Sequence, residues 1–556
     1  MRDIVTPRPA STLILVRDGR LGLEILLGEK NSKVNFAAGA FVFPGGALDT
    51  TDLRINFRLA GGLTDEKANQ ILGIDDGGLS YWIAAIRECF EEVGVLLAKP
   101  SEKLLFNQDE FAAFCSRKRD ELTCGQISFQ EFVQEGSLVL EVDQLHYFSR
   151  WVTHAGSPRR YDTRFFIAQM PQGQVAQHDG GELIDHRWLS PSKALHLSGE
   201  GKLNLMFPTR KTLEKLQEFS SAGEALDYAR SARPIAPMDP RLTIGSDGKK
   251  LLVPGDYAYA EAGKLDPEQR GTVSREIKPG VAVQLDKRVI RLTAPNPSVM
   301  TGPGTNTYIL GDAINGFLVV DPGPENQEHI DSIRGVTSDQ VRWILCTHTH
   351  VDHSPGARLL SLYSGARVLG CMPNYMERQD QEFCPHEQPT DGQVLHFGDV
   401  TIDVIHTPGH ASNHLCFLFA EAHMLFTGDH IMQGSTVVIN PPDGNMSDYF
   451  SSLSKLYDYE FDWIAPGHGF LMDNPHEAID RLLVHRRKRE AKVINALSLI
   501  GQGTIDDLTI KAYEDVSPAL HPLAKRSLLA HLIKLLQEQR VLQDGNLWIN
   551  CPSAED

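Results

Sequence analysis

Apolar and polar residues follow two different spacings over residues 1–230. Short apolar runs bounded by turn-forming residues predict β-strands, whereas apolar positions three and four residues apart predict helices. Three runs predict strands: Thr12–Val16, Leu23–Leu27 and Arg164–Met170. Helical spacing occupies two stretches, near residues 80–98 and 209–229. The mixture predicts an α/β domain over residues 1–230.

Three further regions follow this first domain. Residues 231–280 hold six prolines and little sustained periodicity, which predicts a linker or a lid strapped over a neighbouring domain. Over residues 281–480, short apolar strands alternate with loops that carry histidines. Residues 481–556 have helical spacing up to Arg540 and then a hairpin pattern with Asp544-Gly545 at its turn.

Composition narrows the class of protein. At 556 residues the chain is too long for one hydrophobic core. No apolar run approaches the roughly 18–20 residues of a membrane-spanning helix, so we expect no membrane association. The eight cysteines are scattered without a CxxC pair, which favours a cytoplasmic location. The net charge of −18 disfavours non-specific binding of long nucleic acids.

The densest group of potential metal ligands follows the apolar run Trp343–Cys346. Three histidines and one aspartate lie there within six residues: His348, His350, Asp352 and His353. Imidazole and carboxylate groups suit Zn²⁺, and a catalytic zinc keeps one position for water. An isolated histidine is usually structural, but this density predicts a catalytic metal site.

Three later turns carry further potential ligands. His410, Asp429 and His468 each follow an apolar run and lie next to glycine. Glycine is expected where the backbone approaches a metal pocket closely. The other histidines nearby lack that support and are interpreted as bystanders or as residues behind the ligands: His386, His396, His406, His414, His423 and His430.

This series of motifs resembles the metallo-β-lactamase superfamily over about residues 281–480. The resemblance implies an αββα sandwich with two zinc ions, whose ligands would be His348, His350 and His410 for the first and Asp352, His353 and His468 for the second. Asp429 would bridge the ions, and Asp352 would orient the nucleophile and take part in proton transfer. An aspartate rather than a cysteine at the bridge is similar to the glyoxalase II and ribonuclease branches. Hydrolysis of an ester, thioester or phosphodiester is therefore expected instead of antibiotic hydrolysis.

Two neighbouring segments narrow this resemblance. Residues 294–308 and Asp321-Pro322-Gly323 are similar to the β-lactamase-like protein 2 group, some members of which are endoribonucleases. In the tail, His485-Arg486-Arg487 and residues 529–535 look like the winged-helix-like C-terminal domain of that group.

A second potential metal site lies on the predicted helix near residues 80–98. Glu88, Glu91 and Glu92 share one side of that helix. Carboxylates this close repel one another unless a cation joins them, and hard oxygen ligands suit Mg²⁺ or Mn²⁺ bridging a diphosphate. An acidic triplet alone would favour a solvated helix face, but here Phe43-Pro44-Gly45-Gly46 precedes it.

These motifs resemble the Nudix box. Gly46 and Asp52 match its first half, with Asp in the place of Glu, and 34 residues replace the seven that usually precede the Arg87 position. Residues 26–46 are similar to the upstream motif of Nudix hydrolases of coenzyme A, which implies CoA or an acyl-CoA as substrate. The implied site consists of Glu88, Glu91 and Glu92 as metal ligands, Glu91 and Glu92 also in catalysis, Lys30, Gly45 and Gly46 at the substrate, and Glu182 as a candidate base.

The sequence therefore predicts an α/β multidomain protein. Its parts are a Nudix α/β/α sandwich (1–230), a linker or strap (231–280), an αββα metallo-β-lactamase sandwich (281–480) and a small winged-helix-like domain (481–556). We expect a bifunctional hydrolase acting on small molecules, with two zinc ions at one site and Mg²⁺ or Mn²⁺ at a CoA-type Nudix site.

Two alternatives stay open. In the first, the chain is an RNA-processing enzyme whose Nudix domain handles a 5′ diphosphate while the zinc domain cuts the strand. The cluster Arg486-Arg487-Lys488-Arg489 favours this slightly, although a solvated helix end is the better explanation of such a cluster. In the second, the displaced Nudix box belongs to a non-catalytic ligand-binding module attached to one zinc hydrolase.

Overall fold

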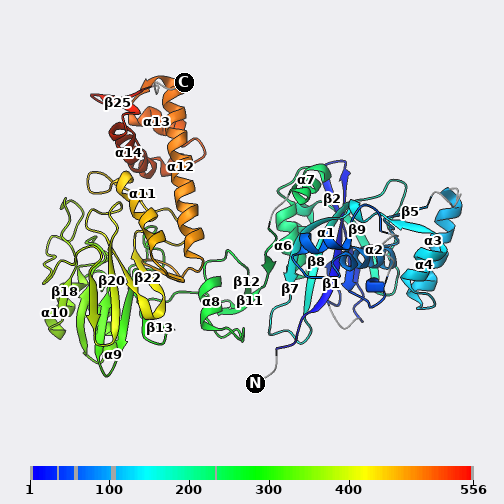
Figure 1. The fold of residues 1–556 in the computed structure, drawn as a ribbon, viewed down its shortest axis with the longest axis horizontal. Coiled ribbons are helices and arrows are strands. Elements are labelled where there is room, and N and C mark those ends of the chain that lie inside the picture. Colours follow the sequence, from blue (N-terminus) through cyan, green and yellow to red (C-terminus); the bar gives the residue numbers. More distant parts are fainter. Residues whose placement is uncertain (1–3, 34–36, 55–59, 102–107, 232–233, 552–556) are drawn as a thin grey trace. The chain divides into compact units, whose positions relative to one another are not determined.

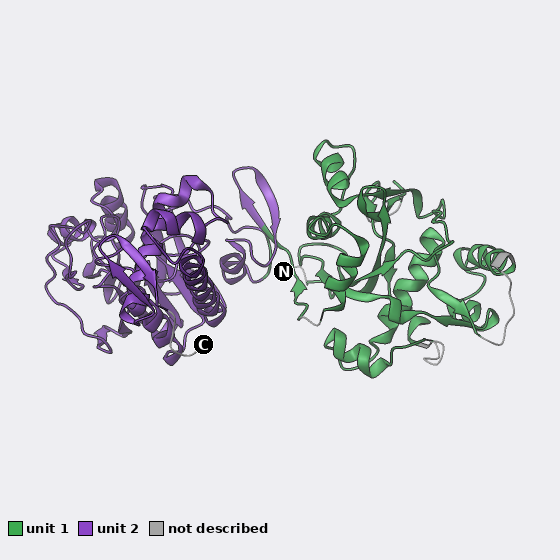
Figure 2. Ribbon diagram, turned by 90° about the horizontal axis from the view of Figure 1, so that it is seen from above, with its two compact units in different colours: residues 1–242, 268–270 green, residues 243–267, 271–556 purple. Residues whose placement is uncertain are grey.

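The computed structural model describes residues 4–33, 37–54, 60–101, 108–231 and 234–551. The chain divides into two compact units (Figure 2). Unit 1 consists of residues 1–242 with 268–270, and unit 2 of residues 243–267 with 271–556. Within the described residues, no helix combines the length and the apolar character that crossing a membrane requires.

Unit 1 is built on one sheet of eight strands with the order β10-β7-β8-β1-β2-β3, to which β4 and β9 add beside β1 and β2 (Figure 1). These strands are β1 (Arg8–Gly19), β2 (Gly22–Lys30), β3 (Phe41–Val42), β4 (Gly45–Ala47), β7 (His146–Val152), β8 (Tyr161–Gln169), β9 (Leu183–Leu189) and β10 (Pro237–Met238). A second, two-stranded sheet joins β5 (Ala98–Pro100) and β6 (Leu138–Leu140). The helices are α1 (Asp65–Leu72), α2 (Leu79–Val93), α3 (Gln108–Thr123), α4 (Phe129–Glu135), α5 (Pro191–Gly199), α6 (Phe207–Leu216) and α7 (Ala222–Arg230).

Helices cover both faces of the large sheet, because β1 is apolar at both sets of alternating positions. Leu13 and Leu15 are buried together with Ile83 of α2 on one face. On the other face, Trp151 of β7 contacts Phe207 of α6 with ring centroids 6.1 Å apart. This arrangement is the α/β/α sandwich that the sequence predicts for the first domain.

Two helical predictions differ from the structure in detail. The helix expected near residues 80–98 is α2, which ends at Val93 because Gly94 adopts a left-handed conformation with φ of 69°. The stretch expected near residues 209–229 forms two helices, α6 and α7. The second begins where the Ser221 side chain accepts a hydrogen bond from the Glu224 amide, which caps a new helix.

Unit 2 contains two stacked sheets (Figure 1). The first has the strands β13 (Ala282–Asp286), β14 (Val289–Thr293), β15 (Asn306–Asp312), β16 (Gly316–Val320), β17 (Val341–Leu345) and β18 (Arg367–Leu369). The second has the strands β19 (Val394–Phe397), β20 (Val400–His406), β21 (Leu415–Phe419), β22 (Met424–Gly428) and β23 (Trp463–Pro466). The helices of this part are α8 (Tyr259–Leu265), α9 (Gln327–Thr337), α10 (Gly356–Ser364) and α11 (Met446–Lys455), and the small strands β11 (Arg241–Gly245) and β12 (Gly248–Leu252) precede α8.

The two sheets share one apolar core. Tyr308 of the first sheet and Phe426 of the second lie in it with ring centroids 4.9 Å apart. Ile330 of α9 and Leu360 of α10 are buried against the outer face of the first sheet. Leu453 of α11 is buried with residues of the second sheet. Helices therefore lie outside two stacked sheets, as predicted for an αββα sandwich.

The C-terminal part combines three helices with a small sheet. The elements are α12 (Pro475–Ile500), β24 (Gln502–Gly503), α13 (Ile505–Ala512), α14 (His521–Gln537), β25 (Val541–Asp544) and β26 (Leu547–Asn550). The hairpin expected at Asp544-Gly545 joins β25 and β26. α12 continues across residue 480: Ile479 is buried in the core beneath the second sheet, and Leu497 in the core with α13 and α14.

Within unit 2, residues 243–267 pack against the residues of the two stacked sheets. Glu261 of α8 and Arg291 of β14 form a buried, bidentate ion pair with nitrogen–oxygen distances of 2.6 and 2.9 Å. The Tyr257 carbonyl accepts a hydrogen bond of 2.7 Å from the Gln433 amide. This segment therefore lies against the αββα sandwich and is called the strap below.

Candidate metal centres

The first histidines of unit 2 stand at the edge where two parallel strands, β16 and β17, end. Asp321 follows β16, and its carboxylate accepts hydrogen bonds of 2.7 Å from both the amide and the hydroxyl of Thr347, which follows β17. Asp321 has a φ of 49°, a conformation that turns the chain sharply. The next residue after Thr347 is His348, so this contact sets where the histidine loop begins.

The seven side chains predicted as ligands in unit 2 come together. In the first group, His350 Nδ1 lies 2.9 Å from His348 Nε2 and 3.0 Å from His410 Nε2. In the second group, Asp352 Oδ2 lies 3.4 Å from His468 Nε2 and 3.6 Å from His353 Nε2. All ligand atoms within each group lie within 4.8 Å of one another.

Asp429 lies between the two groups. Its Oδ2 is 3.6 Å from His410 Nε2, whereas its Oδ1 is 3.4 Å from His353 Nε2 and 3.3 Å from His468 Nε2. One oxygen therefore faces each group, as a bridging carboxylate requires.

The residues fit a pair of divalent cations. His353 Nε2 and Asp429 Oδ1 are buried and have no hydrogen-bond partner in the described part of the chain. Buried polar atoms are normally hydrogen-bonded, so atoms left over at a converging point indicate a missing binding partner. The donor set of imidazole nitrogens and carboxylate oxygens is the one that zinc accepts.

The histidines of the two groups differ in the direction in which their pKa values are shifted. Burial, together with the neighbouring imidazoles, holds the pKa of His348 well below its ordinary value and lowers that of His350 to about 3. Burial also opposes protonation of His468, but the carboxylates of Asp429 and Asp352 outweigh it and raise its pKa to about 9. The first group thus offers unprotonated nitrogens, whereas the second holds imidazolium–carboxylate pairs until a cation replaces the proton.

Further contacts orient the imidazole rings through the nitrogen that does not face the centre. His353 Nδ1 lies 2.9 Å from Asp321 Oδ2, and His410 Nδ1 lies 2.7 Å from the Val438 carbonyl. His468 Nδ1 lies 3.2 Å from the Gly304 carbonyl. Such partners fix ring orientation in metal sites. The sequence motif that contains Asp321 does not by itself indicate this contact. No local sequence pattern indicates the contacts of the Val438 and Gly304 carbonyls either.

His414 and His430 lie behind the first group. His414 is fully buried, stacks on His348 with ring centroids 5.1 Å apart, and bonds Thr407 through Nδ1. Burial lowers the pKa of His430 to about 3. Both therefore pack behind the ligands as neutral rings. His406, by contrast, lies 3.1 Å from the Ser412 carbonyl through Nε2.

One glycine shows why the turns need small residues. A Cβ at Gly467 would lie 2.8 Å from both Asp429 Oδ1 and His353 Cε1. Any side chain would therefore displace two predicted ligands. The glycine predicted beside His468 is required by this close approach.

In unit 1, the glycines of β4 lie directly against the carboxylates of α2. The Gly45 amide donates a hydrogen bond of 3.0 Å to Glu92 Oε2. A Cβ at Gly46 would overlap the carboxylate of Glu88. The Phe-Pro-Gly-Gly motif and the acidic helix therefore lie in direct contact, as a shared site would require.

Arg87 connects this site to the long insertion. Its guanidinium donates two hydrogen bonds of 2.9 Å to the buried carboxylate of Asp52, and it also contacts Glu88 at 2.9 Å and Glu91 at 3.1 Å. The 34 intervening residues therefore leave Asp52 beside the helix. Both carboxylate oxygens of Asp52 accept hydrogen bonds from Arg87.

Lys30 and Glu182 complete the cluster. The Lys30 ammonium bonds Glu182 and lies 3.7 Å from Glu92 Oε1. Burial raises the pKa of Glu88 to about 7, raises that of Glu91, and holds that of Glu92 well above its ordinary value. Glu92 Oε1 is buried and has no hydrogen-bond partner within the described residues. Desolvated carboxylates of this kind fit an added cation such as Mg²⁺.

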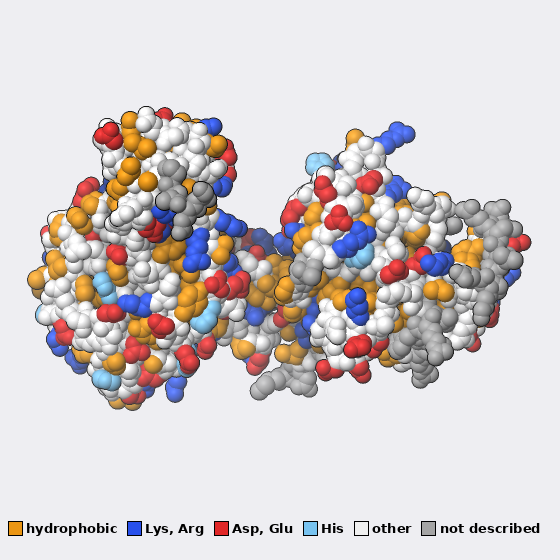
Figure 3. Space-filling model, turned by 45° about the horizontal axis from the view of Figure 1, so that its top comes forward, with side chains coloured by type: hydrophobic (Ala, Val, Ile, Leu, Met, Phe, Trp, Pro, Cys, Tyr) orange, Lys and Arg blue, Asp and Glu red, His pale blue; other side chains and the backbone are white. Residues whose placement is uncertain are grey.

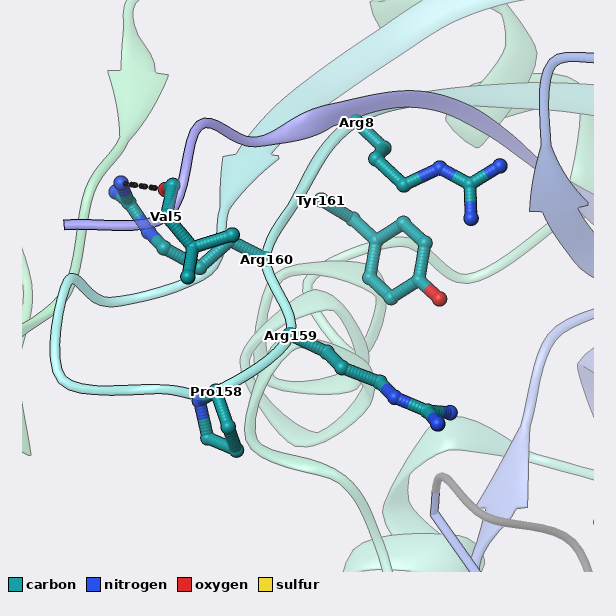
Figure 4. A pocket seen from close by; sticks show the side chains of 6 residues that line it. All are labelled: Val5, Arg8, Pro158, Arg159, Arg160 and Tyr161. Atoms are coloured by element: carbon teal, nitrogen blue, oxygen red, sulfur yellow. Dashed lines mark hydrogen bonds between the residues drawn. The ribbon is translucent and has the colours of Figure 1, made fainter. Parts of the chain in front are cut away.

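A cavity of about 360 Å³ lies elsewhere in unit 1, at the start of β1 (Figure 4). It is lined by Val5, Arg8, Pro158, Arg159, Arg160 and Tyr161. The Arg160 guanidinium is held by the carbonyls of Val5, at 2.9 Å, and Thr153, at 2.8 Å. This lining includes neither the histidine cluster nor the acidic helix, so the cavity is not part of either predicted metal site.

Comparisons with known proteins agree with this division. The metallo-beta-lactamase superfamily model matches residues 300–468, and the beta-lactamase associated winged helix domain model matches residues 504–548. The NUDT19 Nudix domain model matches residues 63–216.

Individual relatives each cover part of the chain. A "Beta-lactamase-like protein 2 homolog" of Caenorhabditis elegans is 30% identical over 280 residues, which is 49% of this chain and 92% of that protein. An "Atrochrysone carboxyl ACP thioesterase" of Aspergillus fumigatus is 29% identical over 220 residues, 39% of this chain and 67% of that protein. Among solved structures, a NUDIX hydrolase from Alicyclobacillus acidocaldarius is 25% identical, covering 42% of this chain and 100% of that one, with a TM-score of 0.34.

The protein belongs to the metallo-β-lactamase superfamily. It is a metal-dependent hydrolase that also carries a Nudix domain and a winged-helix domain.

Proposed function

We propose that the protein is a bifunctional hydrolase with a dizinc thioesterase site in unit 2 and a Mg²⁺- or Mn²⁺-dependent diphosphatase site in unit 1. The observation that carries the proposal is the convergence of three histidines on one point, with Asp429 between them and a second group. His348, His350 and His410 would hold the first zinc, and Asp352, His353 and His468 the second. Bound zinc would supply an activated water and polarise the scissile oxygen.

The protein's own residues prepare this chemistry in two ways. Asp352 is partly open to solvent, with an exposed side-chain fraction of 23%, compared with 7–12% for His410, Asp429 and His468. It is therefore suited to accept a proton from the attacking water and pass it on. The buried rings of His348 and His414 exclude solvent from the inner side of the first group.

Apolar side chains near the centre favour a thioester with an acyl chain over a polyanion. Val351, between two ligands, is 60% exposed, and Tyr375 and Met376 are also exposed. The segment that contains Tyr375 lies near the candidate metal centre. The Asn374 amide donates a hydrogen bond of 2.9 Å to the hydroxyl of Ser412, which follows His410 by two residues. Exposed apolar side chains in one region favour an apolar ligand.

The surface supports the same preference. Arg486 of the basic cluster is buried and donates to the Val437 carbonyl, and Arg489 pairs with Asp515 at 3.0 Å. On the face shown in Figure 3, Lys and Arg side chains are interspersed with Asp and Glu in each unit. A protein that binds RNA by phosphate contacts needs a basic stripe instead.

In unit 1, Glu88, Glu91 and Glu92 would hold Mg²⁺ or Mn²⁺, and Lys30, Gly45 and Gly46 would border the diphosphate. Glu182 would be the candidate base. A CoA derivative is the proposed substrate because it carries both a thioester and a diphosphate, one bond for each site. The 29% identical thioesterase relative supports the first half of this assignment.

A substrate panel on the full-length protein tests the proposal. Zinc-loaded protein should release free thiol from acyl-CoA thioesters, and Mg²⁺ should add cleavage of the CoA diphosphate. No release from any thioester, combined with a salt-sensitive gel shift of short single-stranded RNA, would favour the RNA-processing alternative. Thiol release without Mg²⁺-dependent cleavage of any diphosphate would favour a non-catalytic Nudix module.

A further inference from the structure

The turn that carries His468 is held from several sides. Its base is closed by paired backbone hydrogen bonds of 3.0 Å between Ile464 and Met472. On the side of the first sheet, the Asn306 side chain donates to the carbonyls of Pro466 at 3.1 Å and Gly469 at 2.8 Å. These contacts lie within the αββα sandwich itself.

The remaining side of the turn is held by the strap. Glu261 Oε2 accepts a hydrogen bond of 2.9 Å from the amide of Leu471, three residues after His468. The Phe470 amide donates a hydrogen bond of 3.0 Å to Gln433 Oε1, and the Gln433 amide donates in turn to the Tyr257 carbonyl at 2.7 Å. Two successive amides of the turn are thus bonded to the strap, one directly and one through Gln433.

Glu261 can do this because it is held rigidly. Its carboxylate takes both hydrogen bonds from the Arg291 guanidinium, and both side chains are only 2–3% exposed. A bidentate pair of this kind has a fixed geometry. The third hydrogen bond, to the Leu471 amide, therefore sets the position of the turn relative to β14.

We infer that Glu261 is a positioning residue for His468 and thereby sets the affinity of the second metal position. The strap lies between the regions matched by the Nudix and metallo-β-lactamase models, at residues 63–216 and 300–468. A segment that precedes the αββα sandwich in the chain thus contributes to its metal centre. This inference rests on the proposed dizinc site.

Metal titration of the full-length protein tests it. Zinc is added to metal-free protein in the presence of excess Mg²⁺, which keeps the carboxylate site of unit 1 filled, and binding is followed by competition with a chelator. Wild-type protein should bind two zinc equivalents in unit 2. Glu261→Gln should keep the first and bind the second about 10- to 100-fold more weakly, the range for partners that orient metal ligands.

A matched control separates positioning from stability. Glu490 is a largely buried carboxylate of α12 that pairs with Lys534 at 2.9 Å, remote in the chain from the ligand turns. Glu490→Gln should lower the melting temperature but leave both zinc affinities unchanged. If Glu261→Gln destabilises the fold too strongly, the double variant Glu261→Leu/Arg291→Met, which leaves no buried charge unpaired, takes its place.

The possible outcomes are distinct. Two zinc equivalents of wild-type affinity in Glu261→Gln would overturn the positioning role while leaving the dizinc site intact. Failure of wild-type protein to bind zinc in unit 2 would instead remove the proposed site itself. Weakening of both zinc positions to the same extent would also contradict the inference, because the turn that Glu261 bonds carries His468, a predicted ligand of the second zinc alone.

Discussion

The two candidate metal sites are built in opposite ways. In unit 1, Glu88, Glu91 and Glu92 come from little more than one turn of α2, so one local element brings them together. In unit 2, the ligands come from four separate turns, and His348 and His468 are 120 positions apart. The helix α2 alone brings the three carboxylates of the first site together, whereas the ligands of the second site meet only when both sheets are stacked.

The charges differ as well. The site in unit 2 mixes acids and imidazoles, and the imidazoles of His468 and His353 hold the pKa of Asp429 well below its ordinary value despite its burial. The site in unit 1 places like charges together, and burial raises the pKa of all three carboxyls. The opposite charges in unit 2 therefore balance one another at neutral pH without a metal. The three carboxylates of unit 1 must instead be neutralised by a proton, by the neighbouring Arg87 and Lys30, or by a metal ion.

The largest expected effect is the loss of one activity without the other. His350→Ala removes the nitrogen that lies within 3.0 Å of two other predicted ligands. Thioester hydrolysis should fall by about 10³-fold or more, because bound zinc contributes several kcal/mol to catalysis. Diphosphate cleavage should stay within about twofold of wild type by the uncertainty of such measurements. His396→Ala, which changes an exposed histidine of β19, should leave both activities unchanged in the same assays.

The converse variant is Glu91→Gln in unit 1. Mg²⁺-dependent diphosphate cleavage should fall by about 10²-fold, the usual contribution of one acid–base or ligand group. Zinc-dependent thiol release should not change. Glu218→Gln, at an exposed ion pair with Lys215, is the control. Equal product yields from Glu91→Gln and wild type would show that the acidic helix is not catalytic.

The pH dependence of stability should distinguish the two units. Burial raises the pKa of Glu88 to about 7 from an ordinary value near 4.5, so the Glu88 carboxyl contributes most to the stability of metal-free unit 1 below pH about 4.5, and unit 1 loses this contribution as the pH rises through 7. Its melting temperature should fall by a few degrees over this window. Calorimetry of the metal-free protein at several pH values measures it. Saturating Mg²⁺, or Glu88→Gln, should flatten the profile, and an unchanged slope in both would contradict this account.

The smallest effect is expected at Lys30. Its ammonium lies 3.7 Å from Glu92 Oε1 and bonds Glu182, so it competes with a metal for these carboxylates. Lys30→Met should tighten Mg²⁺ binding severalfold by removing that competing charge. If Lys30 also contacts phosphate, KM for the diphosphate should rise severalfold with little change in kcat. Lys33→Met, at an exposed lysine nearby, is the control. Weaker Mg²⁺ binding in Lys30→Met would mean that Lys30 supports the metal.

Much of the fold was predictable because its signals are local. The strand expected at Leu23–Leu27 lies within β2, and the Asp544-Gly545 turn joins β25 to β26. Strand and turn patterns depend on residues a few positions apart, so periodicity detects them. The helix expected near residues 80–98 extended too far because apolar spacing continues beyond Gly94, where the backbone turns left-handed.

The role of Asp321 was not predictable in the same way. Its carboxylate binds both Thr347 and His353, which follow the neighbouring strand. Only the pairing of β16 with β17 brings these residues to one edge. Sequence spacing carries no signal of that kind.

By itself, the sequence determined the residue types of both candidate sites and the order of the domains, since ligand spacing, glycine placement and hydrophobic periodicity are written along the chain. The tertiary structure alone decided what surrounds them. It placed Lys30 against Glu182, 152 positions away, and Glu261 against Leu471, 210 positions away. Such contacts depend on how sheets and helices pack, and packing is set by the whole core rather than by any neighbouring residues. For that reason the strap, which the sequence presents as a linker or a lid, meets the turn of a predicted metal ligand only in the folded protein.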